Sequence, residues 1–167
     1  MPAYYGKYRG TVVNNLDPMQ MGRLLVMVPD VMGVGLSSWA MPCVPLAGPQ
    51  MGAYFVPVIG SGVWVEFEGG NPDYPIWTGG FWGSAAEVPA LALAGLPASP
   101  SIVLQTAGQN SIVVSDLPGA GGIILKAATG AMIMINETGI TISNGQGAMI
   151  MLNGPTITIN QGALVIT

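Results

Sequence analysis

Residues 102–167 consist of short runs in which apolar and polar residues alternate, separated by turns rich in Gly and Asn. Alternation with a period of two is typical of a β-strand with one apolar face. The runs predict eight strands, which begin at residues 102, 112, 123, 132, 140, 149, 157 and 164. The segment AMIMIN (131–136) recurs as AMIMLN (148–153). Because one strand and its turn repeat, the pattern predicts a solenoid or β-helix.

The spacing of the strands distinguishes between kinds of β-helix. Left-handed single-chain helices repeat about every six residues, and right-handed ones use strands and loops of more varied length. A strand about every eight residues instead favours three copies wound about one axis, with each strand between strands of the other two copies. Three copies would also bury apolar side chains, worth roughly 1.5–3 kcal/mol for each Ile, and would pair strand edges that one copy leaves open. Residues 102–167 are therefore predicted to form an intertwined trimeric triple-stranded β-helix.

The alternation also predicts which side chains face the axis of the trimer. These are Ile133, Ile135, Ile140, Ile142, Ile150, Leu152, Ile157 and Ile159. The strands MIMIN and MIMLN allow two orientations. If their terminal Asn residues are aligned, the methionine side chains point outward (Met132, Met134, Met149 and Met151). In the opposite orientation, these methionines are buried. An outward apolar face without charge indicates a surface that contacts something.

The first half of the chain has a different pattern, with short apolar runs separated by turns that contain Pro, Gly, Asn and Asp. Five strands are predicted, at YRGTVV (8–13), RLLVMV (23–28), WAMPCVPL (39–46), VWVEFE (63–68) and PIWTGGFW (75–82). In VWVEFE, the side chains of Val63, Val65 and Phe67 share one face. Five short strands in this length favour an all-β OB-fold barrel, with a small SH3-like barrel as the alternative.

Aromatic residues mark the boundary between the two halves. All 4 Trp, 5 Tyr and 3 Phe lie between Tyr4 and Trp82. The segment that follows is rich in Ala and Pro, and its prolines favour an extended, semi-rigid connection. The predicted organisation is an OB-fold domain at 1–83, a linker at 84–101 and a β-helix at 102–167.

Composition argues against several classes of function. The chain has 4 basic and 8 acidic residues, too few cations for a protein that displaces counterions from nucleic-acid phosphates. It has no His and one Cys, Cys43, which is expected to be a small buried hydrophobe. We therefore expect no metal site, no cofactor and no catalytic residue. The segment MPAYYGKYRG lacks the apolar region of a secretory signal, and no apolar run is long enough to span a membrane, which predicts synthesis in the cytoplasm.

Four motifs occur together between residues 8 and 83: a G-x-V after the first strand, a D-P…G-R turn, a P-x-x-G and a G-[ND]-P-D-x-P-[IV]-x-x-G hairpin. They are carried by Gly10, Val12, Asp17, Pro18, Gly22, Arg23, Pro57, Gly60, Asn71, Pro72, Asp73, Pro75, Ile76 and Gly79. This combination resembles the OB-fold domain of contractile-tail central spike proteins. Members include phage baseplate assembly protein V and the valine-glycine repeat (VgrG) spikes of type VI secretion.

The resemblance implies a non-enzymatic homotrimer whose OB domains dock on a baseplate hub protein and whose β-helix punctures the target cell membrane. It also implies a separate, cone-shaped PAAR-like tip protein at the C-terminal end. Some relatives carry a lysozyme domain between barrel and helix, where this chain has the 84–101 linker. Others carry a His-x-His iron site, and this chain has no His. Whether the particle is a phage tail baseplate, a tailocin or a secretion apparatus stays open.

Two groups of residues are compatible with other functions. Glu66 and Glu68 point the same way from one strand, at a spacing near that of a glycosidase pair, but a solvated barrel face is the expected role. Trp64, Trp77 and Trp82 would offer a stacking platform in an OB-fold nucleic-acid-binding protein with a trimerising tail. The scarcity of cations instead favours contacts with another barrel or with the hub.

Overall fold

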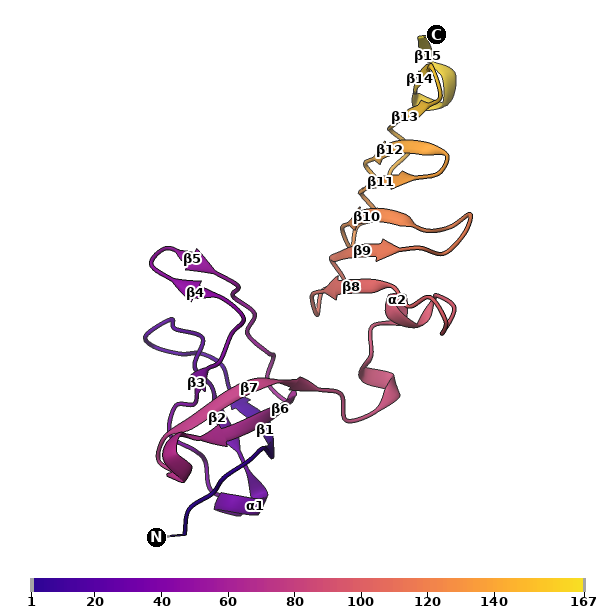
Figure 1. The fold of residues 1–167 in the computed structure, drawn as a ribbon. Coiled ribbons are helices and arrows are strands. Elements are labelled where there is room, and N and C mark those ends of the chain that lie inside the picture. The colour runs from indigo at the N-terminus through magenta and orange to yellow at the C-terminus, as the bar shows by residue number, and fades with distance from the viewer. Residues whose placement is uncertain (1, 167) are drawn as a thin grey trace. The chain divides into compact units, whose positions relative to one another are not determined.

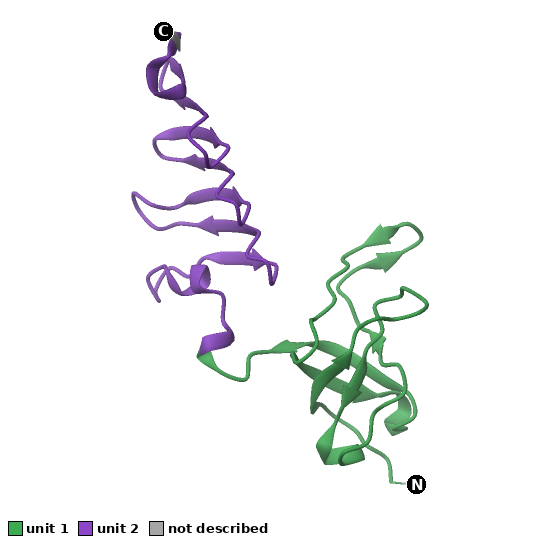
Figure 2. Ribbon diagram, turned by 180° about the vertical axis from the view of Figure 1, so that it is seen from behind, with its two compact units in different colours: residues 1–85 green, residues 86–167 purple. Residues whose placement is uncertain are grey.

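A computed structural model describes residues 2–166 and divides the chain into two compact units between Ala85 and Ala86 (Figure 2). Unit 1 comprises residues up to Ala85, and unit 2 comprises those from Ala86 onward. Most of the regular structure in both units is β-strand (Figure 1). The division falls inside the 84–101 segment, which contains the short helices η2 (Ala85–Glu87) and α2 (Ala90–Leu93).

Unit 1 is built on a five-stranded sheet in the order β2-β1-β6-β7-β3. Its strands are β1 (Tyr8–Asn14), β2 (Leu25–Met27), β3 (Met41–Pro42), β6 (Gly62–Phe67) and β7 (Pro75–Phe81). A bridge between Leu24 and Ala40, just before β2 and β3, brings the two ends of the sheet together. Outside this sheet lie α1 (Pro29–Met32), the hairpin β4 (Ala47–Gly48) and β5 (Met51–Gly52), and η1 (Glu68–Gly70).

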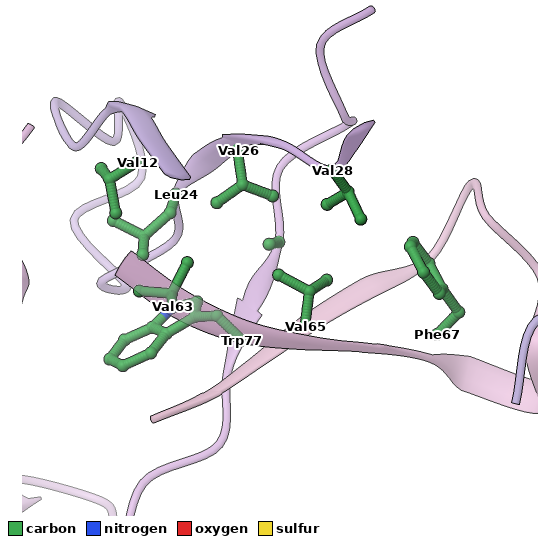
Figure 3. Packing of buried hydrophobic residues seen from close by; sticks show 9 residues of the cluster. Val12, Leu24, Val26, Val28, Val63, Val65, Phe67 and Trp77 are labelled. Atoms are coloured by element: carbon green, nitrogen blue, oxygen red, sulfur yellow. The ribbon is translucent and has the colours of Figure 1, made fainter. Parts of the chain in front are cut away.

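The core of unit 1 lies inside the curved sheet (Figure 3). It comprises Val12, Leu24, Val26, Val28, Ala40, Val63, Val65, Phe67 and Trp77. The predicted alternation in β6 is confirmed, because Val63, Val65 and Phe67 are all buried while the residues between them are not. The ring N–H of Trp77 donates to the carbonyl oxygen of Gly22 at 3.0 Å, so this large side chain is buried without an unpaired polar atom.

Two predictions for unit 1 were wrong. The segment 39–46 forms a strand at Met41–Pro42 only, because Pro42 and Pro45 cannot donate hydrogen bonds to a neighbouring strand. Cys43 is exposed rather than buried, since it lies just beyond that short strand, where its backbone N–H donates to the carbonyl oxygen of Trp77 at 2.9 Å.

Unit 2 contains one eight-stranded sheet whose strands follow each other in chain order (Figure 1). The strands are β8 (Ile102–Gln105), β9 (Ser111–Ser115), β10 (Gly122–Lys126), β11 (Met132–Asn136), β12 (Gly139–Ser143), β13 (Met149–Asn153), β14 (Thr156–Ile159) and β15 (Leu164–Ile166). Every neighbouring pair is antiparallel. All eight lie where the apolar alternation predicts them.

The pairing of these strands differs from the winding that the sequence suggested, in which strands of other copies separate those of one chain. Each strand is instead hydrogen-bonded to its sequence neighbours in the same chain. The turns explain this difference. Glu137–Thr138 joins β11 to β12 and Gly154–Pro155 joins β13 to β14, and such two-residue connections link adjacent antiparallel strands.

Candidate functional site

One face of the unit 2 sheet carries two unbroken columns of aliphatic side chains, which we call the apolar ladder. Cross-strand register defines both columns, with each member paired to the next. The first column is Ile102, Val114, Ile123, Ile135, Ile140, Leu152, Ile157 and Ile166. The second column is Leu104, Ile112, Leu125, Ile133, Ile142, Ile150, Ile159 and Leu164. All eight residues predicted to face the trimer axis belong to this ladder.

The apolar ladder is open to solvent in a single copy. Fourteen of its sixteen members are 36–68% exposed, and Ile157 and Ile159 are half-buried. Among the side chains of unit 2 that the structure describes, Val113 is the one buried hydrophobic residue. A sheet of this kind needs a second apolar layer, because burial of apolar area is the main term that stabilises a fold.

The opposite face of the sheet carries the methionines together with smaller side chains and Lys126, which lies opposite Met132. Along its middle, Ile124, Met134, Thr141, Met151 and Thr158 are cross-strand neighbours in that order. Met132 and Met149 lie on the same face, each opposite Ser143. The structure thus separates all four methionines from the apolar ladder, and which face meets the other copies stays a prediction.

Asparagine side chains hold the turns along one edge of this sheet in place. The side-chain oxygen of Asn110 accepts a hydrogen bond from the backbone N–H of Ala128 at 3.1 Å, which joins two successive turns. Asn160 likewise accepts from the backbone N–H of Met149 at 3.0 Å. Gly130 and Gly145 approach so closely that a Cβ at Gly145 would lie 2.6 Å from the carbonyl carbon of Gly130. The turns along this edge therefore contact one another in a stack, as the strands of the sheet do.

In unit 1, the motif residues noted in the sequence lie at turns and at close crossings of the backbone. The most connected is Asp17, whose carboxylate accepts hydrogen bonds from the backbone N–H groups of Met19, Met21 and Arg23. The Arg23 guanidinium donates to the same carboxylate from two nitrogens, at 2.7 and 3.0 Å. Both nitrogens donate to Oδ1 of Asp17, the ion pair is nearly buried, and the guanidinium also lies over the ring of Trp39.

The other motif residues have comparable backbone roles. A Cβ at Gly10 would lie 2.9 Å from a methyl group of Val65, so only Gly fits where β1 crosses the core. The carbonyl oxygen of Pro57 accepts from the Asn15 side chain, and that of Val12 accepts from the N–H of Gly60. These residues set the path of the chain and do not form a catalytic group.

The next motif residues form the turn between β6 and β7. The Asn71 side chain accepts from the N–H of Asp73 at 3.0 Å, which closes the turn. Pro75 is fully buried where β7 begins. Gly79 follows a bulge in the pairing of β6 with β7. This part of the motif therefore fixes how the two central strands are joined.

Two family models match the chain and together cover most of it. Residues 8–82 match the type VI secretion system/phage-baseplate injector OB domain. Residues 101–165 match the phage baseplate V C-terminal trimerisation domain. The chain belongs to the baseplate spike family. No curated protein matches the sequence.

Membership shows that this baseplate spike protein is a structural component of a baseplate and that unit 2 is its trimerisation domain. Both families are structural rather than enzymatic. The OB-domain match covers every motif residue from Gly10 to Gly79, and the trimerisation match covers almost the whole apolar ladder. The resemblance identified from the sequence is thereby confirmed.

In the spike protein, the carboxylates considered for glycoside hydrolysis and the tryptophans considered for nucleic-acid stacking lie apart or already contact other residues. Glu66 forms an ion pair with Lys7 at 2.7 Å, whereas Glu68 belongs to η1. Trp77 is buried in the core, while Trp82 is exposed and Trp64 packs with Arg9 and Phe81. The three tryptophans therefore do not form one platform.

Within residues 2–166, no three His, Cys, Asp or Glu side chains are grouped so that they could hold a metal ion. No helix in that range has the length and hydrophobicity to cross a membrane.

Sequence reasoning missed one feature of unit 1, an exposed apolar segment around the hairpin β4–β5. Its members Tyr54, Phe55 and Ile59 are each more than half exposed. The sequence does contain a sign of this apolar segment, because no charged residue occurs between Asp30 and Glu66. The apolar residues there do not alternate, however, and so they did not indicate a strand or a surface.

The Asp17–Arg23 pair predicts a dependence of stability on pH. The Arg23 guanidinium lowers the pKa of Asp17 well below its ordinary value, and the backbone N–H groups of Met19, Met21 and Arg23 act in the same direction against the effect of burial. A carboxyl whose pKa is lower in the folded state stabilises the fold above its unfolded pKa of about 3.9. That contribution is lost as the pH falls below about 4 towards the folded pKa.

We therefore expect Asp17→Asn to lower the melting temperature of unit 1 at pH 7, with the deficit shrinking below about pH 4. Tryptophan fluorescence of the full chain measures this, because all 4 Trp lie in unit 1. Glu66→Gln is the control, since its ion pair with Lys7 is exposed and such pairs contribute about 0–1 kcal/mol. Equal and pH-independent effects of the two substitutions would contradict the assigned role of Asp17.

Proposed function

We propose that three copies of this protein pack their apolar ladders around one axis and form the central shaft of a contractile-tail spike. The observation that carries the proposal is the open face of sixteen aliphatic residues in a unit that buries almost nothing alone. Three sheets that face one axis form a three-sided β-helix, to which each copy contributes eight strands. At about 4.8 Å per strand, the shaft would be roughly 40 Å long.

Hydrophobic burial is large enough to hold such a shaft together. Full burial of one Ile or Leu is worth roughly 1.5–3 kcal/mol, and a ladder residue still exposed by about two-fifths gains on the order of 1 kcal/mol. Sixteen such residues in each of three copies give a strong driving force for association. Strands paired along the whole length make the shaft stiff.

The outer surface of the shaft would then carry the methionine face. No charged residue follows Glu137, so the last four strands, β12 to β15, carry no charge. The part of the shaft formed by these four strands need not strip water from ions when it enters a lipid layer, which is otherwise costly. This supports a mechanical role in which sheath contraction drives the shaft through the envelope of a target cell.

The two ends of the protein fit different partners. The injector OB match supports docking of unit 1 on a baseplate hub protein. At the other end, β15 is the last strand of its sheet and has an open edge in one copy. Open strand edges are usually covered, which supports a separate PAAR-like tip protein on the C-terminal end of the shaft. The particle that carries the spike would be a virion tail baseplate or a related injection apparatus.

A force measurement tests the puncturing role. Full-length trimers are held through unit 1 on a force-microscope tip and pressed into a supported phospholipid bilayer. We expect Met134→Lys/Met151→Lys to leave the mass in solution unchanged but to raise the breakthrough force, because each copy then carries two more ammonium groups that must lose water. The control Val34→Lys/Tyr74→Lys adds the same charge at exposed positions of unit 1 and should leave the force unchanged.

Two results would count against this proposal. If the double Met variant no longer forms trimers, the methionines face the axis and the face assignment is wrong. If the variant keeps its mass and enters the bilayer as easily as the native protein, the low charge of the outer face has no part in puncturing.

A further inference from the structure

Unit 1 carries an exposed apolar segment at residues 46–59, which we call the apolar arm. Its exposed large hydrophobic residues are Leu46, Met51, Tyr54, Phe55, Val58 and Ile59, each 52–69% exposed. The arm includes the hairpin β4–β5, which projects from the five-stranded sheet of unit 1 (Figure 1). Exposed apolar groups of this size usually mark an interaction surface.

The arm is a defined part of the fold and not a loose loop. The Asn15 side chain donates to the carbonyl oxygen of Pro57 at 3.0 Å, and the N–H of Ala53 donates to the carbonyl oxygen of Leu46 at 2.9 Å. The hairpin itself has only two paired residues in each strand, all of them exposed. An isolated two-stranded hairpin is marginally stable in water, so this hairpin gains most from a surface that covers it.

The chemistry of the arm indicates a permanent partner. No charged residue occurs between Asp30 and Glu66, whereas Lys7, Arg9 and Glu66 lie together elsewhere on unit 1. Permanent interfaces between subunits are more apolar than transient ones, and charged residues are depleted at their centres. The arm has this composition.

We propose that the apolar arm packs against unit 1 of a neighbouring copy in the trimer, so that the OB domains form a second, separate interface. This inference rests on the trimer described above. Trimerisation through residues 101–165 brings three copies of unit 1 together. In each copy, no more than residues 86–101 connect unit 1 to the trimerisation domain, and each residue spans at most about 3.6 Å. Short tethers that can span the two sites give effective concentrations on the order of mM, so a second copy meets the arm before other proteins do.

Photo-crosslinking of the purified full-length protein tests this contact. Phe55 is replaced by the photoreactive analogue p-benzoylphenylalanine, which keeps an aromatic ring at that position. The matched control carries the analogue at Tyr74, an exposed aromatic residue of unit 1 outside the arm. After irradiation we expect covalent dimers and trimers on a denaturing gel from position 55 and few from position 74. The crosslinked peptides should come from unit 1 of another copy.

A charge within the arm should weaken the contact without affecting the shaft. We expect Tyr54→Asp to reduce the interchain product from position 55 severalfold, whereas Tyr74→Asp leaves it unchanged. The mass in solution, measured before irradiation, should be that of a trimer in every variant.

The results separate this inference from the proposed function. A trimer that gives no interchain product at position 55, or products only with residues 102–166, overturns the inference and leaves the shaft intact. Products that form only after a hub protein is added also overturn it, because the arm is then a hub contact. A monomeric mass before irradiation contradicts the proposed trimer itself.

Discussion

Ile142→Glu is expected to abolish the trimer and leave a chain with the mass of one copy. Ile142 lies in the middle of the apolar ladder, between Ile133 and Ile150 on the neighbouring strands. In the proposed shaft its side chain faces the axis, so three carboxylates would meet at one level without a cation. An uncompensated buried charge costs roughly 3–5 kcal/mol per copy, several times the gain of about 1 kcal/mol from one ladder residue, and all three copies carry this cost at the same level. Light scattering of the purified protein measures the mass.

The adjacent residue provides the control, because Thr141 lies on the opposite face of the same strand, between Met134 and Met151. We expect Thr141→Glu to keep the trimer mass and lower stability by no more than about 1 kcal/mol per copy. Tryptophan fluorescence should show an unchanged unit 1 in both variants, which separates loss of assembly from general misfolding. If both substitutions dissociate the protein, or neither does, the ladder does not face the axis.

Gly139→Ala is the second substitution with a large expected effect. Gly139 begins β12 with a φ of +135°, a conformation that side chains rarely adopt, and a Cβ there would overlap the carbonyl oxygen of Leu152 on β13. The backbone strain costs about 1–3 kcal/mol, and the forced separation of the two strands adds about 1–3 kcal/mol. Each copy of a trimer carries the change. We expect a large drop in the melting temperature of the β-sheet signal by circular dichroism.

Gly147→Ala separates the two contributions to that loss. Gly147 has a φ of +103°, yet a Cβ there would meet nothing within 4 Å. This variant therefore introduces backbone strain without the overlap, and it should lose clearly less stability than Gly139→Ala. Equal losses would mean that the close approach of Gly139 to Leu152 does not limit the packing of the strands.

The strands of unit 2 could be predicted from sequence because their signals are local. Apolar residues alternate within each strand, and Gly or Asn marks each turn, so positions such as Met132–Asn136 are evident without tertiary information. The grouping of Ile133, Ile140 and Ile150 on one face follows from the same alternation. The partner of each strand was less evident, because an eight-residue repeat fits both hairpins and interleaved copies. Only the two-residue turns distinguish these arrangements.

Unit 1 was less predictable where tertiary contacts override local pattern. The apolar run 39–46 has the composition of a strand, but its prolines leave only Met41–Pro42 paired, beside β7. The role of Asp17 could not be read from sequence beyond a turn motif, because its partners become evident only when Arg23 folds back over it. The apolar arm follows no strand or helix period, so neither its shape nor its exposure could be predicted.

The mass of the native protein in solution tests the central claim most directly. That claim is that the apolar ladder of one copy is covered by two other copies and not by its own chain. Light scattering on the purified full-length protein should give three times the chain mass of 17.1 kDa over a wide range of concentrations. A stable, folded species with the mass of a single chain would contradict the account.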